Sequence, residues 1–201
     1  MFIENDIRKP KGSIEVVCGS MFSGKTEELI RRIKRAQIAK LKCKVFKPTV
    51  DTRYDDVKVV SHSKLEVDSI PVAYSKDIIP ETHKLDVVGI DEAQFFDQEL
   101  VRVCEHLADK GIRVIIAGLD MDSDGIPFGP MPNLLSRAEF VTKLHAVCID
   151  CGDLANFTSS KADKNQLVLL GETEEYEALC RGCFNKKNSF EKKITVNLKN
   201  E

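Results

Sequence analysis

Short apolar runs alternate with amphipathic stretches through the first 118 residues of the chain. A short apolar run is typical of a buried strand, whereas apolar residues spaced three and four apart predict a helix. The main predicted strands are Ser13–Cys18, Cys43–Lys47, Leu85–Ile90 and Ile112–Gly118. Weaker patterns predict short strands at 57–60 and 70–72 and a brief helix at 75–79.

Two longer helices are predicted between these strands. In Glu27–Ala36 the apolar residues fall on one face, and a second apolar face runs from Leu100 to Ala108. Asp97 is the expected N-cap of the second helix, which should run to Lys110 and end at Gly111. Strands that alternate with helices predict an α/β fold, with a parallel sheet covered by helices on both faces.

The pattern changes after residue 118. Between Leu119 and Pro132, aspartate, glycine and proline interrupt every regular element, which predicts a long loop and a candidate lid. Further on, residues 155–158 and 166–170 have β-like patterns. The polar tail, residues 185–201, is expected to be mostly disordered.

Composition and charge exclude several classes of protein. The 201 residues are 42% hydrophobic and 31% charged, which is ordinary for a soluble globular protein. The formal net charge of −2 argues against a protein built mainly to bind nucleic acid. The polar N-terminus predicts no signal peptide, and no apolar run reaches the ~18 residues of a membrane helix. We therefore expect a cytoplasmic protein without a nucleic-acid or membrane partner.

The candidate chemistry centres on a phosphate-binding loop between the first strand and the first helix. Its eight residues fit G-x-x-x-x-G-K-[ST] and are Gly19, Ser20, Met21, Phe22, Ser23, Gly24, Lys25 and Thr26. The glycines let backbone N–H groups turn around an anion, and the helix N-terminus adds partial positive charge. A chance glycine turn is the alternative, but it would not explain the flanking strand and helix.

An acidic pair, Asp91 and Glu92, ends the third main strand. Together with the Thr26 hydroxyl, Asp91 is the expected ligand of the Mg²⁺ that accompanies ATP. Glu92 is the expected general base. The residues leave the acceptor open: activation of water makes an ATPase, and activation of a bound hydroxyl makes a kinase.

A polar loop follows the second strand. Arg53 in this loop is a candidate for a phosphate contact, with Asp51 orienting it. A solvated surface turn explains these residues equally well.

Seven cysteines divide into two groups. Cys18, Cys43 and Cys104 occur singly in apolar segments, which favours small buried side chains. The others form two C-x₂-C pairs, Cys148 with Cys151 and Cys180 with Cys183. This spacing predicts a closed, structural Zn²⁺ site with four thiolate ligands, whereas disulfides are the alternative and are rare in the cytosol.

The motifs together resemble the cytosolic, zinc-containing thymidine kinases. The likeness covers about residues 13–184. Its matching segments are the phosphate loop, Phe46–Pro48, Asp51–Tyr54, Asp91–Phe96, Ala117–Asp120, Pro127–Gly129, Thr142–Cys148, Tyr176 and both cysteine pairs.

The resemblance implies ATP-dependent phosphorylation of the 5′-hydroxyl of thymidine or deoxyuridine. It also implies a RecA-like core, a homotetramer and feedback binding of thymidine triphosphate. Its ATP-binding positions are the phosphate loop, Asp51, Arg53, Asp91, Glu92, Ala93 and Gln94. Its nucleoside-pocket positions are Met21, Phe95, Leu119, Ser123, Phe128, Thr158, Leu167, Val168, Leu169, Leu170, Gly171 and Tyr176. The expected division is an extension (1–12), a P-loop domain (13–140), a zinc-binding domain with a substrate-covering lasso (141–190) and a tail (191–201).

Two positions depart from the family pattern. Ser123 stands where the lasso usually carries an aromatic residue, and Ser159-Ser160 follow Thr158 where a basic residue is common. A competing hypothesis from another class is a P-loop ATPase whose zinc ribbon binds nucleic acid or a protein. The acidic excess between Cys148 and Cys183 disfavours a nucleic-acid partner.

Overall fold

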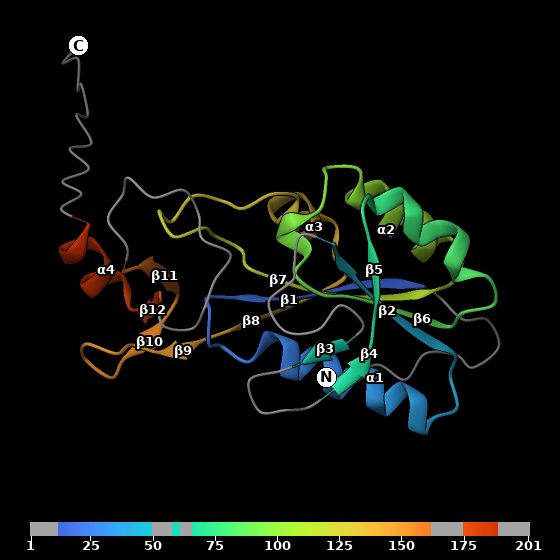
Figure 1. Ribbon diagram of the computed structural model, residues 1–201, viewed down its shortest axis with the longest axis horizontal. Helices are drawn as coiled ribbons and strands as arrows, with labels where there is room; N and C mark the ends of the chain where they lie inside the picture. The colour runs from blue at the N-terminus through green and yellow to red at the C-terminus, as the bar shows by residue number, and fades with distance from the viewer. Residues whose placement is uncertain (1–11, 50–57, 61–65, 162–174, 189–201) are drawn as a thin grey trace, which may run out of the picture.

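The computed structural model describes residues 12–49, 58–60, 66–161 and 175–188. Its centre is a six-stranded sheet in the order β5-β2-β6-β7-β1-β8, in which every neighbouring pair is parallel (Figure 1). The strands are β1 (Ser13–Gly19), β2 (Cys43–Pro48), β5 (Ile70–Val72), β6 (Val87–Ile90), β7 (Arg113–Gly118) and β8 (Phe140–Leu144). Their carboxyl ends therefore meet at one edge of the sheet, where open α/β sheets bind ligands.

Helices cover both faces of this sheet (Figure 1). One face carries α1 (Lys25–Ile38), which buries Leu29, Ile30 and Ile33 against the strands. The opposite face carries α2 (Leu100–Asp109), α3 (Met131–Arg137) and the 3₁₀ helix η1 (Ser75–Thr82). The predicted α/β class with a parallel core is confirmed.

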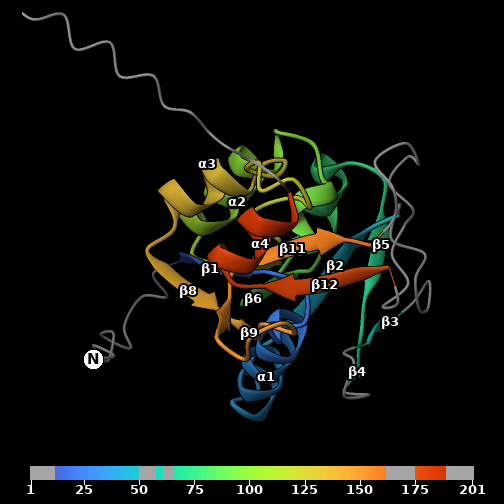
Figure 2. The same ribbon diagram turned by 90° about the vertical axis from the view of Figure 1, so that its left-hand side faces the viewer.

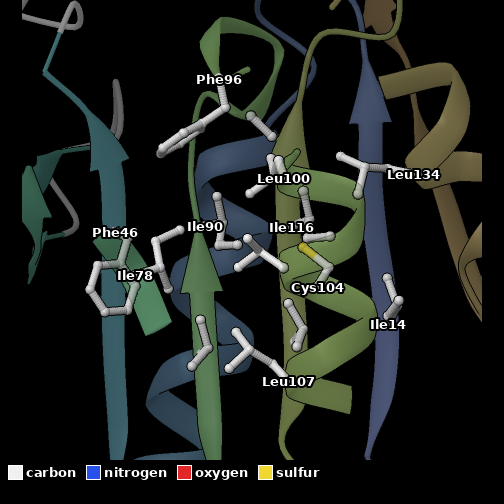
Figure 3. Packing of buried hydrophobic residues seen from close by; sticks show 14 of the residues in the cluster. Ile14, Phe46, Ile78, Ile90, Phe96, Leu100, Cys104, Leu107, Ile116 and Leu134 are labelled. Atoms are coloured by element: carbon white, nitrogen blue, oxygen red, sulfur yellow. The ribbon is translucent and has the colours of Figure 1, made fainter. Parts of the chain in front are cut away.

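The larger of the two sheet-face cores lies beneath α2. Figure 3 shows Ile90 and Ile116 on neighbouring strands, packed against Cys104 and Leu107 of the helix. Along β1, Val16 joins this core and Val17 joins the core on the α1 face. Burial on both faces explains why the strands are continuously apolar rather than alternating.

A small lobe follows β8 directly and contains both cysteine pairs; we call residues 146–160 and 175–188 the cysteine lobe (Figure 2). Its elements are β9 (Ala146–Val147), β10 (Leu154–Ala155), β11 (Phe157–Ser160), β12 (Tyr176–Leu179) and α4 (Arg181–Lys187). The strands form two antiparallel pairs, β9 with β10 and β11 with β12. Phe157 stacks on Phe184 with 4.6 Å between ring centroids, which joins α4 to β11. A further antiparallel pair, β3 (Lys58–Val60) and β4 (Glu66–Asp68), lies outside the main sheet, and η2 (Ala93–Phe95) follows β6.

The structure corrects the prediction for Asp97. The helix α2 begins at Leu100, with Glu99 at its cap position, so Asp97 is not the N-cap. Asp97 Oδ1 does accept the Glu99 backbone N–H at 3.0 Å, just before the helix. The same carboxylate accepts hydrogen bonds from the Ser75 backbone N–H and hydroxyl, at 2.9 and 2.6 Å, and thereby joins the start of α2 to η1. Burial opposes ionisation of Asp97, but these bonds outweigh it and lower the pKa of the carboxyl.

Other differences concern the segments after β7. The loop predicted to reach Pro132 ends earlier, because α3 begins at Met131. The boundary expected after residue 140 falls inside β8, which pairs with β1 from Phe140 to Leu144. Helix α4 occupies the start of what was expected to be a tail. The predicted strand at 166–170 and the rest of the tail beyond 188 lie outside the described residues.

Candidate active site

The phosphate loop closes on its own backbone. Lys25 Nζ and Ser23 Oγ both donate hydrogen bonds to the Ser20 carbonyl, at 2.7 and 2.8 Å. Gly24 has φ 85° and ψ 22°, a left-handed conformation that glycine adopts without strain, and α1 begins at the next residue. Backbone donors and a helix N-terminus converge here, which is an anion-binding arrangement.

Glycine is required at position 19 because no side chain fits there. A Cβ atom at this position would lie 2.3 Å from the Leu144 carbonyl oxygen at the end of β8. The loop therefore starts where β1 and β8 approach too closely for any side chain. Beneath it, Cys18 is buried, and burial raises the pKa of its thiol to about 11. Cys104 is buried as predicted, whereas Cys43 is only half-buried.

The acidic pair lies directly against this loop. The Thr26 hydroxyl donates to Asp91 Oδ2 at 3.3 Å, so the two expected Mg²⁺ ligands are neighbours. Asp91 Oδ1 accepts the Glu92 backbone N–H at 3.0 Å. Asp91 is buried, and its own N–H is bonded to the Phe46 carbonyl of β2. These contacts fix the carboxylates at the carboxyl edge of the sheet.

Glu92 has an unusual backbone. Its φ of 49° and ψ of 41° are left-handed, a conformation that few residues other than glycine adopt. Such geometry persists only when the surroundings impose it and is often found at active sites. Here the Asp91 carboxylate and the Gln94 side chain both hold Glu92, the latter with Nε2 at 2.5 Å from Glu92 Oε2.

The structure brings several predicted pocket residues into contact. Met21 of the phosphate loop donates its backbone N–H to Thr158 Oγ1 at 3.0 Å, and Thr158 is buried. Phe95 and Phe128 form an edge-to-face pair with centroids 5.5 Å apart. The phosphate loop and the cysteine lobe therefore meet at Thr158.

We use the name lasso loop for residues 119–130, the segment that contains Ser123; it precedes residues 141–190, to which the predicted domain division assigned the lasso. Met121 bridges to Pro127, and Asp122 Oδ1 accepts the N–H groups of Asp124 and Ile126, so the loop has a folded tip. A Cβ atom on Gly125 would lie 3.4 Å from the Phe184 ring. The tip therefore rests on the aromatic pair of the cysteine lobe. Ser123 is half-buried within this tip, and Tyr176 is half-buried at the start of β12.

An ion pair fixes the base of the lasso loop, and the sequence patterns did not indicate it. Lys143 Nζ of β8 lies 2.6 Å from Asp120 Oδ2, and the Asp120 carboxylate is only 8% exposed. The two residues are far apart in sequence and carry no shared spacing. They come together because β7, which precedes Asp120, and β8, which contains Lys143, both pair with β1.

The four cysteine thiols lie within 4.8 Å of one another. Cys151 Sγ and Cys180 Sγ are 3.6 Å apart, close to the ~3.8 Å between two thiolates bound tetrahedrally to Zn²⁺ at ~2.3 Å. All four side chains fit a closed tetrahedral site without an open position. The predicted convergence of the two pairs is confirmed.

Some predicted site residues lie outside the described residues. These are Asp51, Arg53 and the segment Leu167, Val168, Leu169, Leu170 and Gly171. Of the other proposed ATP contacts, Ala93 and Gln94 both lie within η2 and are buried. Gln94 uses its amide within the protein, on Glu92 and on the Leu119 backbone N–H.

Comparison with known proteins identifies the family. The family model described as thymidine kinase matches residues 12–184. The chain belongs to the thymidine kinase family. The thymidine kinase of Bacteroides thetaiotaomicron is 56% identical over 186 residues, which cover 92% of this chain and 94% of the relative. The thymidine kinase of Porphyromonas gingivalis (strain W83) is 56% identical over 179 residues, which cover 89% of this chain and 88% of the relative.

A third thymidine kinase, from Rhodothermus, is 54% identical over 173 residues, covering 86% of this family member and 81% of the relative. Among solved structures, domain III of the Thermotoga maritima replication initiation protein DnaA matches 68% of the chain and 56% of that protein. The TM-score is 0.40 and the identity is 16%, so this likeness bears on neither fold nor function. Within the described residues, no helix has both the length and the apolarity needed to cross a bilayer.

Proposed function

We propose that this thymidine kinase family member transfers the γ-phosphoryl group of ATP to the 5′-hydroxyl of thymidine or deoxyuridine. The observation that carries the proposal is the contact of Thr26 with Asp91, which brings the phosphate loop and the acidic pair into one site. Family membership supports thymidine as the acceptor.

In this proposal the phosphate loop binds the triphosphate. Lys25 exchanges its bond to the Ser20 carbonyl for a phosphate oxygen, and the helix N-terminus of α1 stabilises the negative charge. Thr26 and Asp91 would hold Mg²⁺, which supplies charge neutralisation across the phosphates. Arg53, oriented by Asp51, would add a further cation.

Glu92 is the proposed general base. It accepts the proton of the 5′-hydroxyl while that oxygen forms a bond to the γ-phosphorus. The bond between the γ-phosphorus and the bridging oxygen breaks, and ADP leaves. The imposed backbone of Glu92 supports this role, since preorganisation of a base in the required geometry favours the transition state.

The nucleoside would occupy the space between the phosphate loop, the lasso loop and the cysteine lobe. This location is supported by Met21 of the phosphate loop, Phe128 of the lasso loop and Thr158 of the cysteine lobe. Leu119 also belongs to the lasso loop, and Phe95 of η2 pairs with Phe128. The family resemblance adds Tyr176 and Leu167–Gly171 to the proposed pocket. Zn²⁺ on the four cysteines would stabilise the lobe rather than react.

Family resemblance supports three further proposals. They are a homotetramer, a cytoplasmic location and feedback binding of thymidine triphosphate. Analytical ultracentrifugation with and without that nucleotide tests the first and the third.

The decisive experiment is a phosphate-transfer assay with γ-labelled ATP, Mg²⁺ and a panel of nucleosides, on the wild type and on Glu92→Gln. We expect label on thymidine and deoxyuridine, with a rate that falls by about 10²–10⁴-fold in the variant. Free phosphate without labelled nucleoside would instead indicate an ATPase.

A further inference from the structure

We infer that Gln94 is a positioning residue for the phosphoryl transfer: its amide holds Glu92 and ties it to the base of the lasso loop. This inference rests on the proposed role of Glu92 as the base. It differs from the ATP contact that the family resemblance implies for Gln94.

The orientation of the Gln94 amide follows from its partners. The Leu119 backbone N–H, 2.9 Å away, is a donor, so the atom that faces it is the amide oxygen. The NH₂ group must then face the other partner, Glu92 Oε2, at 2.5 Å. The amide is thus bonded at both ends, so it fixes the position of this Glu92 carboxylate oxygen relative to Leu119.

The surrounding chain is built around Gln94, which is only 2% exposed. A Cβ atom on Gly129 would lie 2.2 Å from the Gln94 carbonyl oxygen, and one on Gly118 would lie 3.0 Å from Oε1. Two glycines from different segments thus leave the room that this residue occupies. The buried side chain is thus held between the Glu92 carboxylate and the Leu119 backbone N–H, as expected of a positioning group.

The bonds of Gln94 connect two parts of the site. Leu119 is a proposed wall of the nucleoside pocket and the first residue of the lasso loop, whereas Glu92 is the proposed base. A nucleoside that presses on Leu119 therefore acts on the same amide that holds Glu92. Loss of the amide should disturb the base and leave ATP binding at the phosphate loop intact.

The test compares wild type, Gln94→Met and Gln98→Met. Methionine keeps the length of the glutamine side chain and removes its donor and acceptor, and Gln98 is an exposed glutamine four residues away. For each protein kcat, the KM for ATP and the KM for thymidine are measured, with circular dichroism to verify folding.

In Gln94→Met we expect kcat to fall by about 10- to 100-fold, a typical effect of removing an outer partner of a reacting group. The KM for ATP should not change, and Gln98→Met should match the wild type. A raised KM for ATP with an unchanged kcat would overturn the inference in favour of an ATP contact.

Gln94→Glu gives an independent test if the methionine variant does not fold. Glutamate keeps the length of the glutamine side chain but replaces the NH₂ donor that faces Glu92 with an oxygen. We expect kcat to fall while the KM for ATP stays unchanged. A wild-type kcat would contradict the inference. Wild type that phosphorylates no nucleoside would instead refute the proposed function, which separates the two failures.

Discussion

Thr158 of the cysteine lobe accepts a hydrogen bond from the backbone N–H of Met21 in the phosphate loop, at 3.0 Å. The residues are 137 positions apart in the chain. The contact means that the lobe touches the phosphate-binding backbone itself. Whatever orders the lobe therefore also affects the loop.

Replacement of Thr158 by Val tests this contact. The variant keeps the shape of the side chain but leaves the Met21 N–H without its acceptor, so we expect stability to fall by about 1–2 kcal/mol. The KM for thymidine should rise several-fold, because the pocket wall loses its connection to the loop. Thr82→Val is the matched control. Thr82 is also buried, but it bonds to Ile79 in η1, remote from the site, so it should lose stability without a change in KM.

The zinc prediction concerns the dependence of the lobe on its metal. Cys151→Ser removes one of four ligands, and we expect zinc content to fall from one equivalent and the lobe to become sensitive to protease. Thymidine binding should weaken strongly, whereas binding of ATP to the phosphate loop should persist. Isothermal titration with each ligand separates the two effects. Cys43→Ser, a half-buried cysteine outside the cluster, should retain zinc and both affinities.

Ser123→Phe tests the unusual composition of the lasso loop. An added ring at this position of the lasso loop should stack on the nucleoside and lower the KM for thymidine, by about fivefold for ~1 kcal/mol of stacking. Steady-state kinetics at saturating ATP measures the change. Ser136→Phe, at an exposed position of α3, controls for added hydrophobic surface. An unchanged or higher KM would refute this role of position 123.

The pH prediction concerns Glu28 on α1. Hydrogen bonds from Arg31 and then Arg32 lower the pKa of this carboxyl from 4.5 to about 2. A folded-state pKa below the unfolded one gives stability that is present above about pH 4.5 and is lost as pH falls toward about 2. Arg32 also bonds to Glu15 at 2.7 Å, so the pair anchors α1 to β1.

We therefore expect Glu28→Gln to lower the free energy of unfolding by about 1–2 kcal/mol at pH 7 and by much less near pH 2. Urea denaturation at several pH values gives the difference. Glu99→Gln removes an exposed carboxylate whose nearest Arg102 nitrogen is 3.7 Å away, and it should change stability little at any pH. A Glu28 effect that did not vary with pH would contradict the assignment.

Local patterns predicted the parts of the fold that depend on neighbouring residues. The phosphate loop was predictable because its glycines, lysine and threonine all lie between Ser13 and Ala36, with the strand and helix they require. The convergence of Cys148 and Cys183 was predictable because metal binding needs both pairs together. In both cases the spacing of the residues follows from the group they bind, a phosphate in the first and a metal ion in the second.

Contacts that depend on the alignment of distant strands were not predictable. Lys143 meets Asp120 because β7 and β8 both pair with β1, and Gln94 meets Leu119 because β6 and β7 end side by side. Asp97 has the sequence position of a helix cap, and its carboxylate bonds to Ser75 from another segment as well as to the Glu99 N–H. The short helices α3 and α4 also have too few turns to give a clear periodic pattern.

The position of β8 has a consequence for aggregation. This strand is the edge of the sheet, and β1, which leads into the phosphate loop, is next to it. A chain cut before Phe140, or one whose β8 detached with an unfolded lobe, would leave β1 as an unprotected edge with free N–H and C=O groups. Such edges pair readily with other chains. Retention of β8 would therefore protect β1 from intermolecular pairing, in addition to connecting the sheet to the lobe.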